Sequence, residues 1–214
     1  MIKAIFWDND GVLVDTERLY FLATKKILSK EGIHLSKEQY HDLLLVQSKG
    51  AFVLAGQKGF SQADIETLRS RRNALYKSYL RKKPLVLNGV VETLELLSPH
   101  YTMGIVTTST REHFDIIHKR AGLLDHFDFV ITVDDVEKSK PDPEPYEKAV
   151  RRAGVDKEEC IAVEDSQRGL TAALGAGVQC IIVPNELTRG GDFKGAYRIA
   201  NSVKEIPGLI GAVK

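Results

Sequence analysis

This sequence has few cysteines and almost no net charge. Only two cysteines occur in 214 residues, Cys160 and Cys180, and each opens an apolar run. Two distant cysteines form neither a disulfide framework nor a zinc-binding spacing, so we interpret both as small buried apolar residues. Because the net charge is only +1, we expect neither a basic surface for nucleic acid nor an acidic tail.

Long apolar runs are also missing. No stretch reaches the length of a membrane span, and the N-terminus lacks the pattern of a signal peptide. We therefore expect a cytoplasmic protein that binds neither membranes nor nucleic acid, with a monomer as the simplest assembly. Phosphate-binding P-loops and dinucleotide fingerprints do not occur. The six histidines show no metal-binding spacing, and we interpret them as surface or helix-packing residues.

The most informative stretch that is present is Ile5–Glu17. A short apolar segment, Ile2–Trp7, is typical of a buried strand, and Asp8 and Asp10 follow it. Residues two apart in an extended chain point the same way, so both carboxylates are expected to project together from the strand end. Two like charges held so close are costly unless a cation lies between them or a proton is shared. We predict a metal site or a nucleophile and acid pair.

The order of the expected elements indicates an α/β fold with an inserted helical segment. From Thr16 to Pro84 we expect only helices, whereas strands and helices alternate after Asn88. Such alternation is typical of a Rossmann-like parallel sheet that helices cover on both faces. We predict a catalytic core of residues 1–15 and 85–214 and an all-helical cap of residues 16–84.

Capping signals mark the starts of two expected helices. Ser36 and Gln39 form a capping box for a helix to about Gln47, and Ser109 and Glu112 form one for a helix that stops at 122. The other expected helices cover residues 16–30, 51–58, 61–81, 90–97, 142–154, 167–174 and 203–210. The expected strands cover residues 2–7, 101–107, 127–133, 160–164, 179–184 and 198–200.

Polar residues stand at the carboxyl ends of several expected strands. Thr107–Ser109 follow one strand, Lys140 lies in the loop after the next, and Glu164–Ser166 follow a third. Ligands of open parallel sheets bind beyond the carboxyl ends of the strands. We therefore expect these residues to converge on Asp8.

The chemistry of these residues fits a phosphate and a metal ion. Thr107 and Thr108, just before a helix, are expected to bind phosphate, with Ser109 as the helix cap. Lys140 would supply the counter-charge that clustered carboxylates require. Carboxylates at Asp8, Asp10, Glu164 and Asp165 are the oxygen ligands that Mg²⁺ prefers, although simple capping of the next helix is the alternative for the last two.

Through these motifs the chain resembles the haloacid dehalogenase (HAD) superfamily of phosphohydrolases, in the branch with a helical cap. The resemblance spans nearly the whole chain and rests on Asp8-Asn9-Asp10-Gly11-Val12-Leu13, Thr107, Ser139-Lys140-Pro141 and Glu164-Asp165-Ser166. The first motif is highly specific, and the second is weak alone. Within the branch (subfamily I), the chain is most similar to the phosphatase and β-phosphoglucomutase-like group.

The resemblance implies Mg²⁺-dependent hydrolysis of a small phosphate monoester through an aspartyl-phosphate. Asp8 would be the nucleophile and Asp10 the general acid and base, while Lys140, Thr107 and Thr108 would hold the phosphoryl group. The substrate would be a small phosphorylated metabolite whose identity the sequence leaves open.

The resemblance also implies the metal ligands. These would be the Asp8 carboxylate, the Asp10 main-chain carbonyl and Asp165. Glu164 would be either a further ligand or a neighbour that orients one.

The cap bears on substrate choice and on a rival reaction. Lys49, near Ser48, and Arg72 are candidates for substrate selection, with an ordinary surface charge as the alternative for each. The rival is a sugar phosphomutase of the β-phosphoglucomutase type. Mutases of the family typically carry a histidine where this chain has Tyr20, and the loop Val46–Lys49 lacks their glycine, which favours hydrolysis.

Two other classes are weaker. A receiver-type signalling module also phosphorylates an aspartate near a threonine and a lysine, but its acceptor follows a later strand and it has no inserted cap. A dehalogenase of the family needs no metal and does not use the second aspartate. A plain binding protein is the last alternative, which an assay with a generic phosphate ester would test.

Overall fold

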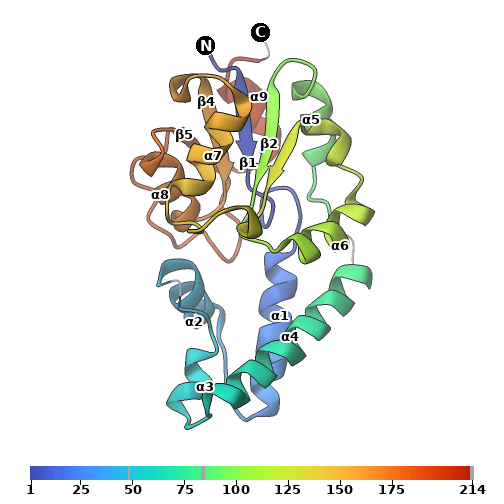
Figure 1. Ribbon diagram of the computed structural model, residues 1–214, viewed down its shortest axis with the longest axis vertical. Helices are drawn as coiled ribbons and strands as arrows, with labels where there is room; N and C mark the ends of the chain where they lie inside the picture. The colour runs from blue at the N-terminus through green and yellow to red at the C-terminus, as the bar shows by residue number, and fades with distance from the viewer. Residues whose placement is uncertain (48, 83–84, 213–214) are drawn as a thin grey trace.

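A central parallel sheet organises the computed structural model, which describes residues 1–47, 49–82 and 85–212 (Figure 1). All the strand pairs in it are parallel. The strands lie in the order β3 (Phe129–Ile131), β2 (Thr102–Val106), β1 (Ala4–Trp7), β4 (Cys160–Glu164), β5 (Gln179–Ile182) and β6 (Arg198–Ile199). The predicted α/β class is therefore confirmed.

Side chains of the central strand β1 alternate between two apolar cores, as the pleat of a strand requires. Ile5 and Trp7 pack with α5 (Val90–Leu97), α6 (Arg111–Ala121) and α9 (Ile206–Leu209). Ala4 and Phe6 pack with α7 (Glu144–Ala153) and α8 (Gln167–Gly175) on the opposite face, so the sheet is covered on both sides. The core also has 3₁₀-helices at Leu124–His126, Val133–Asp135, Lys157–Glu159 and Val203–Glu205.

The strand register sets three carboxyl ends side by side. Trp7 at the end of β1 pairs with Ile105 of β2 and with Val163 of β4. The amide of Asp8 continues this ladder by donating to the carbonyl of Val163 at 2.9 Å. Residues that follow these strands therefore emerge at one edge of the sheet.

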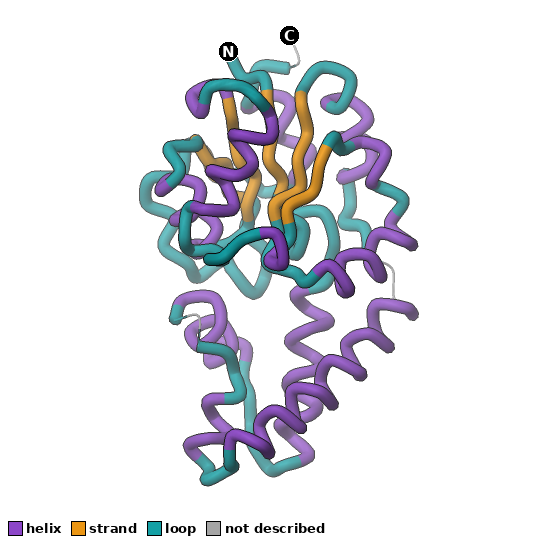
Figure 2. Tube along the Cα trace, viewed as in Figure 1, coloured by secondary structure: helices purple, strands orange, loops and turns teal. Residues whose placement is uncertain are grey.

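Residues 17–82 form a helical segment, the cap, that faces this edge (Figure 2). Its helices are α1 (Glu17–Lys30), α2 (Lys37–Tyr40), a π-helix (His41–Val46), α3 (Val53–Gln57) and α4 (Gln62–Lys82). The cap has an apolar cluster of its own, which includes Phe21, Leu28 and Leu68, and Leu187 of the core joins it. The domain boundaries at 15/16 and 84/85 stay a prediction, and Ser48 and Pro84 lie outside the described residues.

Two details of the helix predictions need correction. The capping box of Ser36 and Gln39 is present, but the α-helix it opens ends at Tyr40 and continues as a π-helix rather than as one helix to Gln47. The expected helix over residues 203–210 is a 3₁₀ turn followed by the short α9. Among the described residues, no helix combines the length and the apolarity that crossing a membrane would take.

Candidate active site

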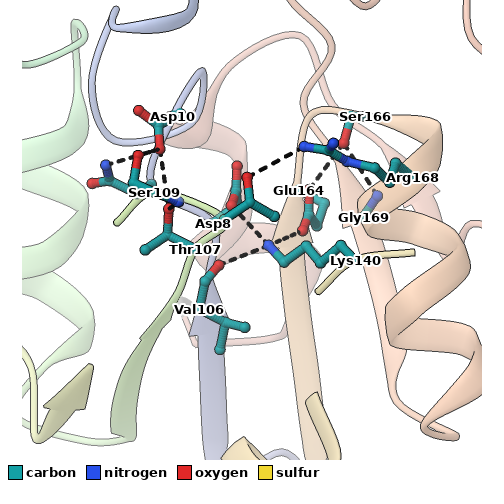
Figure 3. A network of polar contacts seen from close by, with 12 residues as sticks. Asp8, Asp10, Val106, Thr107, Ser109, Lys140, Glu164, Ser166, Arg168 and Gly169 are labelled. Carbon is teal, nitrogen blue, oxygen red and sulfur yellow. Dashed lines mark hydrogen bonds and ion pairs between the residues drawn. The ribbon is translucent and has the colours of Figure 1, made fainter. Parts of the chain in front are cut away.

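Asp8 and Lys140 form the centre of a buried polar site beyond β1 (Figure 3). They are 7% and 4% exposed, and the Lys140 Nζ lies 2.8 Å from the Asp8 Oδ1. The same ammonium donates to the carbonyl of Val106 at 2.7 Å and to the Oε1 of Glu164 at 2.5 Å. An ammonium has three donors, so all of them are used and the charge is fixed in place.

Glu164 is held on the side of Lys140 away from Asp8. It is fully buried, and its Oε1 also accepts the hydroxyl of Tyr146 at 2.7 Å. A Cβ on Gly169 would lie 1.9 Å from the other carboxylate oxygen, so only glycine lets α8 pack this closely. Glu164 therefore orients Lys140 with one oxygen and keeps the other toward α8.

Asp165 brings a third carboxylate to the site. Asp8, Glu164 and Asp165 are buried, and each offers an oxygen within 4.8 Å of the others. Burial, together with the charge of Glu164, raises the pKa of Asp8 to about 8. Burial and the charge of Asp8 raise the pKa of Asp165 well above its usual range.

Burial is the largest cause of both pKa shifts, and the repulsion between the carboxylates, which Lys140 alone does not balance, adds to it. Burial lowers the pKa of Lys140, but Asp8 and Glu164 outweigh that effect and raise it, so it stays an ammonium. A divalent cation would supply the missing charge, and a buried set of carboxylate oxygens matches the preference of Mg²⁺. The residues present therefore fit Mg²⁺.

Asp10 points away from this cluster, toward the hydroxyls of the neighbouring strand end. Its carboxylate accepts hydrogen bonds from Thr107 at 3.0 Å, from Ser109 at 2.8 Å and from Thr16. The prediction that Ser109 caps the following helix is wrong, because Thr110 is the N-cap of α6 and accepts from the amide of His113. The hydroxyl of Ser109 is thereby left to hold Asp10.

His118 of α6 fixes the residue between the two aspartates. It is a packing residue, as expected, stacking on Phe114 at 4.2 Å, but it is 3% exposed and also bonds to Asn9, Nε2 to Oδ1, at 2.8 Å. Burial lowers the pKa of His118 to about 4, so the ring is neutral at pH 7. This contact across two elements has no signal in the local sequence.

A pocket of about 350 Å³ opens beside Asp10, between the cap and the core. Arg72 of α4 lines it and is only 8% exposed, so the surface-charge alternative for Arg72 is wrong. Its guanidinium lies 4.1 Å from the centre of the Tyr20 ring. Lys49 is exposed and does not line this pocket.

Two further residues of the site were not predicted from the sequence. Arg168 of α8 lines the same pocket and donates to the Oγ1 of Thr108 at 3.2 Å. Asn185, in the loop after β5, donates from its Nδ2 to the Oδ2 of Asp165 at 2.6 Å. Both lie outside the four motifs, and only the folded chain brings them to the site.

Comparison with known proteins shows which family the chain resembles. The family profile of haloacid dehalogenase-like hydrolases matches residues 5–183. The chain is 31% identical to protein CbbY of Rhodobacter capsulatus, over 97% of this chain and 99% of CbbY. It is 28% identical to a phosphorylated carbohydrates phosphatase of Thermotoga maritima, over 84% of each chain. A crystal structure of CbbY from Rhodobacter sphaeroides in complex with phosphate superposes with a TM-score of 0.78, at 26% identity and over 96% of both chains.

Proposed function

The chain belongs to the haloacid dehalogenase-like hydrolase family and is a phosphatase of that family, and we propose that it hydrolyses small phosphate monoesters through a phosphorylated Asp8. The observation that carries the proposal is the contact between Lys140 and Asp8 at 2.8 Å. A carboxylate that attacks a phosphate needs a fixed positive charge next to it, because the two anions repel each other.

In the first step, an oxygen of Asp8 bonds to phosphorus while the bond between phosphorus and the ester oxygen breaks. Asp10 gives the departing oxygen a proton. In the second step, a water attacks the phosphoryl group and Asp10 takes its proton, which releases phosphate and restores Asp8. The hydrogen bonds from Thr16, Thr107 and Ser109 hold the Asp10 side chain ready for both transfers.

Asp8, Asp165 and the main-chain carbonyl of Asp10 would hold Mg²⁺, and we assign Glu164 to orienting Lys140. Bound there, Mg²⁺ would supply the positive charge that keeps Asp8 ionised and offsets repulsion from the phosphate. Thr108, between β2 and α6, would donate to the transferring oxygens, whereas the hydroxyl of Thr107 is already used by Asp10.

The leaving group would occupy the pocket beside Asp10. Arg72 and Arg168 line that pocket from the cap and from the core, and within the described residues neither forms an ion pair. A relative in Thermotoga maritima is a phosphatase of phosphorylated carbohydrates. We propose a small polar metabolite as the substrate, with the cap closing over it to exclude water.

The test is an assay with p-nitrophenyl phosphate, in Mg²⁺ and in EDTA. We expect activity only with Mg²⁺, and a loss of at least about 1,000-fold in Asp8→Asn. Asp115→Asn, an exposed carboxylate of α6, is the matched control and should keep full activity. Substantial turnover by a pure, folded Asp8→Asn protein would refute the assignment of the nucleophile.

A further inference from the structure

The loop after β5 reaches the active site through one side chain. Among the described residues, Asn185 makes the only side-chain hydrogen bond that Asp165 accepts, at 2.6 Å. The other end of the Asn185 amide is also used, because its Oδ1 accepts the main-chain amides of Leu187 at 2.8 Å and Thr188 at 3.2 Å. These two donors fix which end of the amide faces Asp165.

The same few residues contact the cap. Leu187 is 7% exposed and belongs to the apolar cluster of the cap, although it lies in the core part of the chain. Its neighbour Glu186 forms an ion pair with Lys37 of α2. A Cβ on Gly190 would come within 3.7 Å of the ring of His41, so the loop passes close to the π-helix as well.

Together these contacts make residues 185–188 a short link between a carboxylate of the site and the cap. If the cap moved away, Leu187 would lose its apolar surroundings and Glu186 its partner. The turn that the Oδ1 of Asn185 closes would then be free to shift, and Asp165 would lose its donor. Gly11 adds to the crowding here, since a Cβ on it would lie 2.3 Å from Asp165 and 2.7 Å from Asn185.

We propose that Asn185 is a positioning residue that couples the orientation of the Asp165 carboxylate to the docking of the cap. The inference rests on the metal role of Asp165 in the proposed function. A hydrogen bond to a metal-binding side chain sets its rotation, and losing such a bond typically weakens metal binding. Coupling between two sites is reciprocal, so Mg²⁺ at Asp165 should in turn stabilise the docked cap.

The experiment is a calorimetric titration of the substrate-free protein with Mg²⁺. Asn185→Ala should weaken Mg²⁺ binding by about 10–100-fold. Leu187→Ala alters only the cap end of the loop, and it should weaken Mg²⁺ binding by about fivefold. In the Asn185→Ala background, Leu187→Ala should weaken Mg²⁺ binding no further, because the hydrogen bond that couples the loop to Asp165 is already missing. Leu68→Ala, which removes a 3% exposed leucine of the same cluster on α4, is the matched control and should bind Mg²⁺ like the wild type.

A second readout separates positioning from simple structural support. In the wild type, Mg²⁺ should slow amide hydrogen exchange in α2 and in residues 187–191, and Asn185→Ala should abolish this response. If Asn185→Ala does not fold, Asn185→Ser takes its place, because serine keeps an acceptor for the turn but lacks the amide donor.

Each outcome decides between the two proposals. Equal Mg²⁺ affinity in the wild type and Asn185→Ala would overturn the role of Asn185 and leave the proposed function standing. If Leu187→Ala still weakened Mg²⁺ binding fivefold in the Asn185→Ala background, the proposed coupling would be wrong. A wild type that binds no Mg²⁺ would instead remove the metal from the proposed function, and this inference with it.

Discussion

The core site and the pocket between the cap and the core hold their positive charges in different ways. In the core, the ammonium of Lys140 has two carboxylates and a carbonyl as partners. In the pocket, Arg72 is almost as buried, but it contacts the ring of Tyr20 and the neutral oxygens of Asn73 and Thr24. A charge with fixed anionic partners serves a constant reaction centre, whereas a charge with neutral partners stays available to an anionic ligand. We infer that chemistry resides in the core site and substrate recognition in the pocket between the cap and the core.

Lys140→Met would break the core side of this comparison and should have the largest effect. It leaves Asp8 and Glu164 buried without their shared counter-charge, which we expect to lower the free energy of unfolding by about 3–5 kcal/mol. Phosphatase activity should be lost as well. Urea denaturation at pH 7 measures the first effect. Lys138→Met, an exposed lysine whose ion pair with Asp142 is 3.9 Å long, is the control, and equal stability of both variants would contradict the account.

The second prediction for the core concerns His118 and the pH dependence of the free energy of unfolding. Its pKa falls from 6.5 to about 4 on folding, so the unfolded chain binds the proton first as the pH drops. The stability from the neutral ring is present above pH 6.5 and is lost as the pH falls toward 4. Between pH 7 and pH 5, the free energy of unfolding of the wild type should fall by about 2 kcal/mol more than that of His118→Gln. If the free energies of unfolding of the wild type and His118→Gln fell equally with pH, the ring would not be buried in its neutral form.

Arg72→Gln tests the cap side, with a smaller expected effect. A hydrogen bond to a charged group contributes about 1.5–3 kcal/mol, so its loss should lower kcat/KM for an anionic substrate by about tenfold or more. The quantity to measure is kcat/KM for esters with an anionic leaving group, such as 3-phosphoglycerate, divided by kcat/KM for p-nitrophenyl phosphate. Arg71→Gln, which loses an outward ion pair with Glu31, is the control. An unchanged ratio in Arg72→Gln would break the comparison.

The smallest effect is expected where the cap meets the core at the surface. Lys77 of α4 and Glu112 of α6 form an ion pair that solvent reaches. Lys77→Gln should therefore lower the free energy of unfolding by less than about 1 kcal/mol, and about 1 M salt should remove the difference. A larger effect that salt does not change would mean that this pair holds the cap in place.

Some features of the core and of the cap can be predicted from the sequence, and others cannot. The convergence of Asp8, Lys140 and Asp165 follows from one rule, that parallel strands bring their carboxyl ends to the same edge. The capping box at Ser36 was equally readable, because its hydrogen bonds are local. Nothing local marks the change of hydrogen bonding at His41, where the π-helix begins.

Residues whose partners are remote in sequence were missed or misassigned. Ser109 looked like a helix cap because serine caps many helices, and its bond to Asp10 spans 99 residues. Asn185 and Arg168 lie in no recognisable motif and owe their positions to the packing of α8 and the loop after β5. Arg72 is buried because α4 packs against α1 within the cap. In each case tertiary packing, rather than a local pattern, decides the role.

The most direct test of the central claim is to trap the phosphorylated enzyme. A ³²P-labelled phosphate ester is mixed with the protein and Mg²⁺, the reaction is quenched in acid during turnover, and the labelled peptide is identified. We predict that the label sits on Asp8 and is absent from Asp8→Asn. Label on Asp10 or another residue, or turnover without any labelled protein, would contradict the account.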